Sequence, residues 1–284
     1  MSKLLIVGFG KIAQNLSSSL SKNIKVFGIK RSETKNIGSI KIYRADILVD
    51  DLTSIIKEIQ PNLILYSVSA DEQTIQDYQN AYETGLKNVI VAAEKIECIK
   101  HFIFLSSTRV YGQNNTKNFL SEADIAKPSD FRGNSLLRGE NLVLKSSIPG
   151  TIIRLSGIYG KNRNYLIKMA KNIKIWPSEN RWTNRINEED VVRFLCFLIR
   201  QLNKKFSIDS LYMLTDNHPV PLYELLNWIR TSMGLKKNEI FNDDVIVGKR
   251  LKSIKLKNLS FKLKYPNYVS GYGMMLEQFN SDET

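Results

Sequence analysis

The chain has 284 residues, long enough for a large hydrophobic core, and only two cysteines, too few for a disulfide framework. Its formal net charge is +13, but the 41 Lys and Arg residues are scattered. This pattern argues against a nucleic-acid-binding tract and fits a phosphate-bearing small molecule as partner. The N-terminal apolar run is too short for a signal peptide or a membrane span, and neither histidine has metal-ligand spacing. We therefore expect a cytoplasmic protein with no metal, membrane or nucleic-acid partner.

The first fifteen residues predict a strand, a glycine turn and the start of a helix. The apolar run KLLIVG is followed by Gly8, Gly10 and Ala13 in a G-x-G-x-x-A pattern. Gly8 allows a sharp turn, Gly10 lets a pyrophosphate approach the backbone, and Ala13 lets the helix pack close to the strand. The amides at the start of the helix then face the phosphates. The predicted dinucleotide-binding residues are Gly8, Gly10, Lys11, Ile12 and Ala13, the alternative being a plain strand-to-helix turn.

The second predicted strand, Lys25–Ile29, ends in Lys30, Arg31 and Ser32. An acidic residue at this place would bind the adenosine ribose and repel a 2′-phosphate. The basic pair Lys30 and Arg31 therefore favours NADP over NAD. The alternative is that both are solvated loop residues.

Strands and helices continue to alternate up to residue 160. Strands are expected at Ile40–Tyr43, Asn62–Val68, His101–Leu105 and Thr151–Leu155. The helices expected between them are Asp51–Ile59, Gln73–Cys98 with an interruption near Gly85, and about Gly133–Ser146. This alternation predicts a doubly wound parallel sheet of the Rossmann type, which binds ligands beyond the carboxyl ends of its strands. Ser67, in the small-residue tail of one strand, is a predicted cofactor contact.

After Gly160 the regular alternation stops. A helix is expected over Ile186–Leu202, a short strand over Leu211–Leu214, and an amphipathic helix over Pro219–Met233 that Gly234 ends. We therefore expect a dinucleotide-binding domain over residues 1–160, to which about 185–215 return. Residues 161–184 and 216–284 are expected to form a smaller substrate-binding region.

Six segments together resemble one protein family. They are GFGKIA, Asp46 after the third strand, LSSTRVYG, IIRLSGIYG, NRINEEDV and YMLTDNHPVPLYELLNWI. Over almost its whole length the chain is similar to extended short-chain dehydrogenases/reductases of the NAD-dependent epimerase/dehydratase group. The resemblance implies a Rossmann fold, a nicotinamide cofactor with Asp46 and Ile47 at its adenine, and a hydroxyl-bearing substrate such as a nucleotide sugar. It also implies a homodimer through the helices predicted over Gln73–Cys98 and Gly133–Ser146.

The chain departs from the family at its catalytic pair. Such enzymes use a Ser or Thr, here matched by Ser107, together with a Tyr-x-x-x-Lys on the following helix. When Glu140 is aligned with the glutamate that ends this motif, Arg132 and Leu136 take the places of the tyrosine and the lysine. Arginine stays protonated in proteins and cannot act as the base. The chain is therefore similar to the atypical extended members that lack the pair.

Three explanations stay open. Another residue can supply the acid/base, with Tyr111 as the nearest candidate; the alternative is that Tyr111 contacts cofactor or substrate without acting as the base. Ser107, the second catalytic candidate, can hold a substrate hydroxyl or cap the following turn. Water or a substrate group can handle the proton while hydride moves. The third explanation is a catalytically inactive NAD(P)-binding regulator or interaction protein.

Arg181 and Arg185 are candidates for binding the substrate. The resemblance places them beside the segment that holds the diphosphate in sugar-nucleotide enzymes, and the guanidinium fork suits a diphosphate. The alternative is pairing with the acidic residues Glu188, Glu189 and Asp190 at the start of the next helix.

Overall fold

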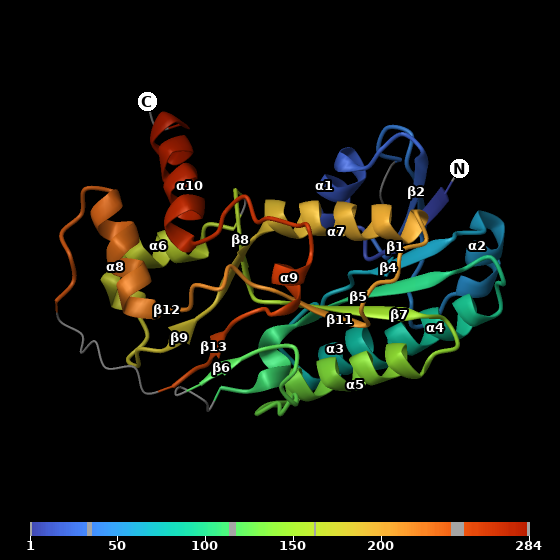
Figure 1. The fold of residues 1–284 in the computed structure, drawn as a ribbon, viewed down its shortest axis with the longest axis horizontal. Helices are drawn as coiled ribbons and strands as arrows, with labels where there is room; N and C mark the ends of the chain where they lie inside the picture. Colours follow the sequence, from blue (N-terminus) through green and yellow to red (C-terminus); the bar gives the residue numbers. More distant parts are fainter. Residues whose placement is uncertain (1, 33–35, 114–117, 162, 240–246, 283–284) are drawn as a thin grey trace. The chain divides into compact units, whose positions relative to one another are not determined.

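A computed structural model describes residues 2–32, 36–113, 118–161, 163–239 and 247–282, the last five of these by their backbone only (Figure 1). The chain divides into two units. Unit 1 contains the residues up to Val110 together with Asp130–Arg154 and Val192–Tyr212. Unit 2 contains Tyr111–Ser129, Leu155–Val191 and the residues from Met213 onward.

A seven-stranded sheet forms the centre of unit 1. Its strands are β1 (Ser2–Val7), β2 (Ile24–Lys30), β3 (Lys41–Arg44), β4 (Leu63–Tyr66), β5 (His101–Ser107), β7 (Gly150–Leu155) and β11 (Leu211–Leu214). They lie in the order β11-β7-β5-β4-β1-β2-β3, and β1 pairs in parallel with both β2 and β4. Starting from β1, the chain adds β2 and β3 on one side of it and then β4, β5, β7 and β11 on the other. This order confirms the predicted doubly wound fold, with its topological switch point between β1 and β4.

Helices cover both faces of this sheet. They are α1 (Lys11–Ser19), α2 (Leu52–Ile59), α3 (Ile75–Gln79), α4 (Gly85–Glu94), α5 (Phe131–Lys145) and α7 (Glu188–Asn203). In Figure 1, α1 and α7 lie on one face, and α3, α4 and α5 lie on the other. Leu4, Leu5, Ile6 and Val7 of β1 are fully buried, as a strand covered on both faces requires.

The helical segment predicted over Gln73–Cys98 is irregular at the expected place. A π-helical turn, Asn80–Thr84, joins α3 to α4, which begins at Gly85. A Cβ atom on Gly85 would lie 2.4 Å from Cδ1 of Ile47. The glycine therefore allows the helix to approach the loop after β3 closely.

Unit 2 has short strands and its own apolar core. Its elements are β6 (Phe119–Leu120), β8 (Gly157–Tyr159), α6 (Tyr165–Lys171), the 3₁₀ helix η3 (Ile173–Ile175), β9 (Trp182–Thr183), β10 (Arg185–Asn187), β12 (Val220–Pro221), α8 (Leu222–Ser232), β13 (Arg250–Leu251), α9 (Lys255–Asn258) and α10 (Tyr268–Asp282). Helices α6 and α8 pack through buried Leu166, Ile167, Leu225 and Leu226. The ring of Tyr159 stacks on that of Tyr272 with 4.4 Å between centroids.

The observed division differs from the predicted one at 111–129 and 155–160, which belong to unit 2, and in the returning segment, which is Val192–Tyr212. Backbone pairing explains the first two differences. Strand β6 pairs with β13, and β8 pairs with β10. Both pairings join an early segment to a late one, and no local pattern in the sequence reveals such a partner.

Among the helices of the described residues, none is both long and apolar enough to cross a membrane.

Candidate functional site

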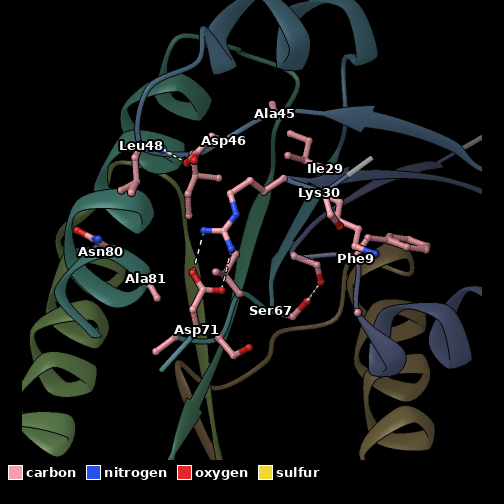
Figure 2. A pocket seen from close by; sticks show the side chains of 18 of the residues that line it. Phe9, Ile29, Lys30, Ala45, Asp46, Leu48, Ser67, Asp71, Asn80 and Ala81 are labelled. Carbon is pink, nitrogen blue, oxygen red and sulfur yellow. Dashed lines mark hydrogen bonds and ion pairs between the residues drawn. The ribbon is translucent and has the colours of Figure 1, made fainter. Parts of the chain in front are cut away.

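A cavity of about 320 Å³ lies in unit 1 at the carboxyl ends of the strands around the switch point. Its lining comes from the loops after β1, β2, β3 and β4 and from the helical segment that follows β4 (Figure 2). The lining residues are Gly8, Phe9, Gly10, Ile29, Lys30, Arg31, Ser32, Ala45, Asp46, Ile47, Leu48, Ser67, Val68, Ser69, Ala70, Asp71, Asp77, Asn80 and Ala81. The structure thus brings together seven of the ten residues predicted to bind the cofactor.

The glycine turn forms one end of this cavity. Gly8 has a φ of 88°, which side chains rarely tolerate, and its carbonyl accepts a hydrogen bond of 2.8 Å from Ser67 Oγ. A Cβ atom on Gly8 would lie 2.6 Å from the backbone nitrogen of Val68. The space around a Cβ on Gly10, in contrast, is open to 4 Å. Gly8 therefore shapes the turn, while Gly10 leaves room for a ligand.

The other three predicted residues begin helix α1, whose N-cap is Gly10. The first intrahelical bond runs from the Gln14 amide to the Gly10 carbonyl, so the amides of Lys11, Ile12 and Ala13 precede it. Ala13 is buried, and none of the three lines the cavity. They contribute the positive end of the helix dipole, which favours a phosphate.

Asp46 and Ile47 line the opposite part of the cavity, in the loop after β3. Oδ1 of Asp46 accepts a hydrogen bond of 2.9 Å from the Leu48 amide. This bond stabilises the turn over residues 46–48. Figure 2 shows the Asp46 side chain at the wall of the cavity.

Lys30 and Arg31 lie at the end of β2, as predicted, but Arg31 is not simply a solvated residue. Its Nη1 and Nη2 donate to the two carboxylate oxygens of Asp71, each over 2.8 Å. The hydrogen bonds from Arg31 hold the pKa of Asp71 below its usual value. Asp71 is not among the site residues predicted from the sequence, although it directly follows the small-residue tail of β4. The dashed lines that reach Asp71 in Figure 2 mark this pair.

Ser107 lies at the end of β5 and does not line the cavity. Its Oγ accepts a hydrogen bond of 3.2 Å from the Arg109 amide. Arg109 and Arg132 both pair with Asp130, at 2.9 and 3.3 Å. Burial alone would raise the pKa of Asp130, but the Arg109 bond and the Gly133 amide outweigh it and lower that pKa.

Leu136, which the predicted alignment puts at the family's catalytic lysine, is 3% exposed and belongs to the hydrophobic core. Arg132, which the same alignment puts at the tyrosine, is bound to the carboxylate of Asp130. Neither side chain can exchange a proton with a substrate at neutral pH.

Tyr111 belongs to unit 2 and does not line the cavity of unit 1. It is 6% exposed, and its hydroxyl donates to the Ser121 carbonyl over 2.7 Å. The following residue, Gly112, has a φ of 69° and accepts a bond from buried Lys249. The phenol is thus held in place by a backbone carbonyl.

Arg181 and Arg185 also belong to unit 2, Arg181 exposed and Arg185 half-buried on β10. The acidic side chains at the start of α7 have other partners. Glu188 pairs with Arg163, Glu189 with Lys264, and Asp190 accepts from the backbone amides of Lys264 and Tyr265.

These contacts leave Nε of Arg185 buried without a hydrogen-bond partner. Burial lowers the pKa of Arg185, while the nearby Tyr272 and the Asp216 carboxylate act in the opposite direction. The predicted alternative, pairing with the carboxylates of α7, is not what the described residues show.

No group of three or more His, Cys, Asp or Glu residues in the described part of the chain could hold a metal ion.

Comparison with known proteins gives a family and a set of related folds. The family described as "RmlD substrate binding domain" matches residues 1–270. A dTDP-4-dehydrorhamnose reductase from Aggregatibacter actinomycetemcomitans is 27% identical over 181 residues, which are 61% of this chain and 58% of the reductase. The match thus spans less than two thirds of that relative's length.

Two solved structures share the fold over nearly the whole chain. A putative NAD-dependent epimerase/dehydratase from Methylobacillus flagellatus is 32% identical, with a TM-score of 0.87 over 98% of this chain and 99% of its own. The enzyme WbmH from Bordetella bronchiseptica, solved with NAD⁺, is 17% identical, with a TM-score of 0.75 over 98% and 99% of the two chains. These similarities confirm the predicted resemblance to NAD-dependent epimerases and dehydratases and the predicted fold class.

Proposed function

The chain belongs to the RmlD substrate-binding domain family, and from this premise we propose that it is an NAD(P)-dependent oxidoreductase acting on a nucleotide sugar. The observation that carries the proposal is the cavity at the switch point between β1 and β4, lined by the glycine turn and the ends of β2 and β3. Ligands of doubly wound sheets bind at such a point. The similarity to the dTDP-4-dehydrorhamnose reductase of Aggregatibacter supports a sugar nucleotide as the substrate class.

The residues of the cavity fit a dinucleotide in three places. The pyrophosphate would lie over Gly10 and the start of α1, where the space is open and the helix dipole is positive. The adenine would lie near Asp46 and Ile47. The adenosine ribose would lie between Lys30, Arg31 and Ser67, whose side chains line the cavity between these two ends.

The nicotinamide cofactor, when bound, supplies or accepts the hydride. The protein must then arrange a route for the accompanying proton without a Tyr-x-x-x-Lys pair. Ser107 and Tyr111 remain the candidate catalytic residues. Because the Tyr111 hydroxyl is held by the Ser121 carbonyl, we favour a proton supplied by water or by a substrate group.

Arg181 and Arg185 are proposed to bind the diphosphate of the sugar nucleotide. Nε of Arg185 supports this role, because it is buried, has no hydrogen-bond partner among the described residues and needs an acceptor. Arg181 is exposed and can therefore reach a ligand.

The second candidate function is a catalytically inactive NAD(P)-binding regulator. One observation favours it: Arg132 is ion-paired and Leu136 is buried, and these are the residues that the predicted alignment puts at the catalytic tyrosine and lysine.

A titration tests the proposal. NADH and NADPH are added to the wild type and to the double variant Lys30→Asp, Arg31→Ala, and nicotinamide fluorescence reports binding. We expect both cofactors to bind the wild type. The double variant should no longer bind NADPH, because the 2′-phosphate of NADPH would find neither of the two cationic side chains.

Oxidation of bound NAD(P)H by 4-keto nucleotide sugars then separates the two candidates. Turnover supports the enzyme, whereas binding without turnover on any tested sugar nucleotide supports the regulator. A wild type that binds neither cofactor would contradict both.

We also propose a homodimer through α4 and α5, the helices at the expected places. Both carry exposed apolar side chains, Val91 at 44% and Leu144 at 51%.

A further inference from the structure

We propose that Asp71 sets the choice between NAD and NADP by holding the Arg31 guanidinium at the adenosine-ribose end of the cavity. The inference rests on the proposed function, since it assumes that a dinucleotide occupies this cavity. It concerns a residue after β4, on the far side of the switch point from the basic pair at the end of β2.

The geometry of the pair supports this role. Both guanidinium nitrogens Nη1 and Nη2 donate to the carboxylate, so the two planar groups face each other with two bonds of 2.8 Å. Both residues line the cavity, and their side chains are 61% and 54% exposed. A ligand can therefore reach the pair, but Nη1 and Nη2 of Arg31 already donate to the Asp71 carboxylate.

The surroundings of Arg31 are acidic. Asp71, Asp46 and Asp77 all line the cavity, and the charges of all three favour the protonated guanidinium and raise its pKa. Among the described residues that line the cavity, Lys30 is the other cation. The potential at the ribose end is therefore less positive than the sequence Lys30-Arg31 suggests.

The two cofactors differ in the group on the adenosine ribose that this part of the cavity must bind. A 2′-phosphate needs cationic donors and is repelled by carboxylates, so it competes with Asp71 for Arg31. A 2′-hydroxyl can donate to the Asp71 carboxylate while the ion pair stays intact. The pair thus lets NAD bind and penalises NADP, even though the strand ends in two basic residues.

An exposed ion pair is weak, so a single substitution can change the outcome. Asp71→Asn removes the negative charge and frees Arg31 for the phosphate. We expect the ratio of the Kd for NADPH to the Kd for NADH to fall by about tenfold, the size of one charge-assisted hydrogen bond.

The experiment compares four proteins by fluorescence titration at constant salt: the wild type, Asp71→Asn, Asp77→Asn, and Arg31→Ala combined with Asp71→Asn. Asp77→Asn is the matched control, because it removes the same charge from the same cavity but not from the pair. We expect its ratio to change by less than about threefold. In the double variant the gain for NADPH should vanish, because Asp71 acts through Arg31.

The inference fails if Asp71→Asn leaves the ratio unchanged while the wild type binds, or if the double variant keeps the gain. It also fails if Asp77→Asn has the same effect as Asp71→Asn, since charge alone would then explain the choice. A wild type that binds neither dinucleotide would instead contradict the proposed function, and this inference with it.

Discussion

At the scale of single residues, Gly8 and Gly10 have different roles in the same turn: Gly8 sets its backbone conformation, and Gly10 leaves space for a ligand. Gly8 has a positive φ and lies against the backbone of Ser67 and Val68, whereas Gly10 lies beside open space. We predict that Gly8→Ala lowers the free energy of unfolding by about 1–3 kcal/mol, because the methyl group meets backbone atoms and the φ is strained. Urea denaturation measures this change.

Gly10→Ala is the matched variant of that prediction. It should cost less than about 1 kcal/mol of stability, yet it should weaken NADH binding because a methyl group fills the expected place of the pyrophosphate. Tight binding by Gly10→Ala would show that the pyrophosphate does not approach this glycine.

At the scale of elements, helix α5 is attached to the sheet by a buried ion pair. Glu140 of α5 accepts two hydrogen bonds from Nε and one from Nη2 of Arg154 on β7, and one of 2.6 Å from Ser106 Oγ on β5. Their side chains are only 3% and 7% exposed. We predict that Glu140→Gln lowers the free energy of unfolding by about 3–5 kcal/mol, because the guanidinium stays buried without its counter-charge.

An exposed ion pair of the same helix provides the control. Arg138 pairs with Glu83 at 2.6 Å, with its side chain 51% exposed. Arg138→Gln should cost less than about 1 kcal/mol in the same denaturation experiment. Equal costs for the two variants would show that burial does not decide the strength of these pairs.

At the scale of the whole molecule, the proposed homodimer predicts a mass of twice 32.6 kDa in multi-angle light scattering. Leu144→Glu places a charge on the exposed face of α5 and should produce monomers, because a buried unpaired charge opposes association. Phe206→Glu is the control: Phe206 is 59% exposed and follows α7, which covers the other face of the sheet. A monomeric wild type would contradict the proposal.

Local patterns in the sequence predicted much of unit 1. The apolar run before Gly8 and the small residues after β4 indicate buried strands and an open ligand edge, since a strand's burial and its end are properties of neighbouring residues. The paired segments of unit 2 could not be found in this way. Phe119 meets Arg250 and Gly157 meets Arg185 only after the chain has folded.

The sequence by itself determined the family, because its six motifs can be found one by one along the chain, and the glycine turn, because that turn depends on adjacent residues. No Tyr-x-x-x-Lys motif occurs in the sequence, which is the basis for the atypical active site that we predict. Only the tertiary structure decided the state of Arg31, since its partner Asp71 lies forty positions away and reaches it across the switch point between β1 and β4. The sequence gives the charge of each side chain, but the electrostatic potential at a bound ligand depends on which other charged groups the fold places beside that side chain.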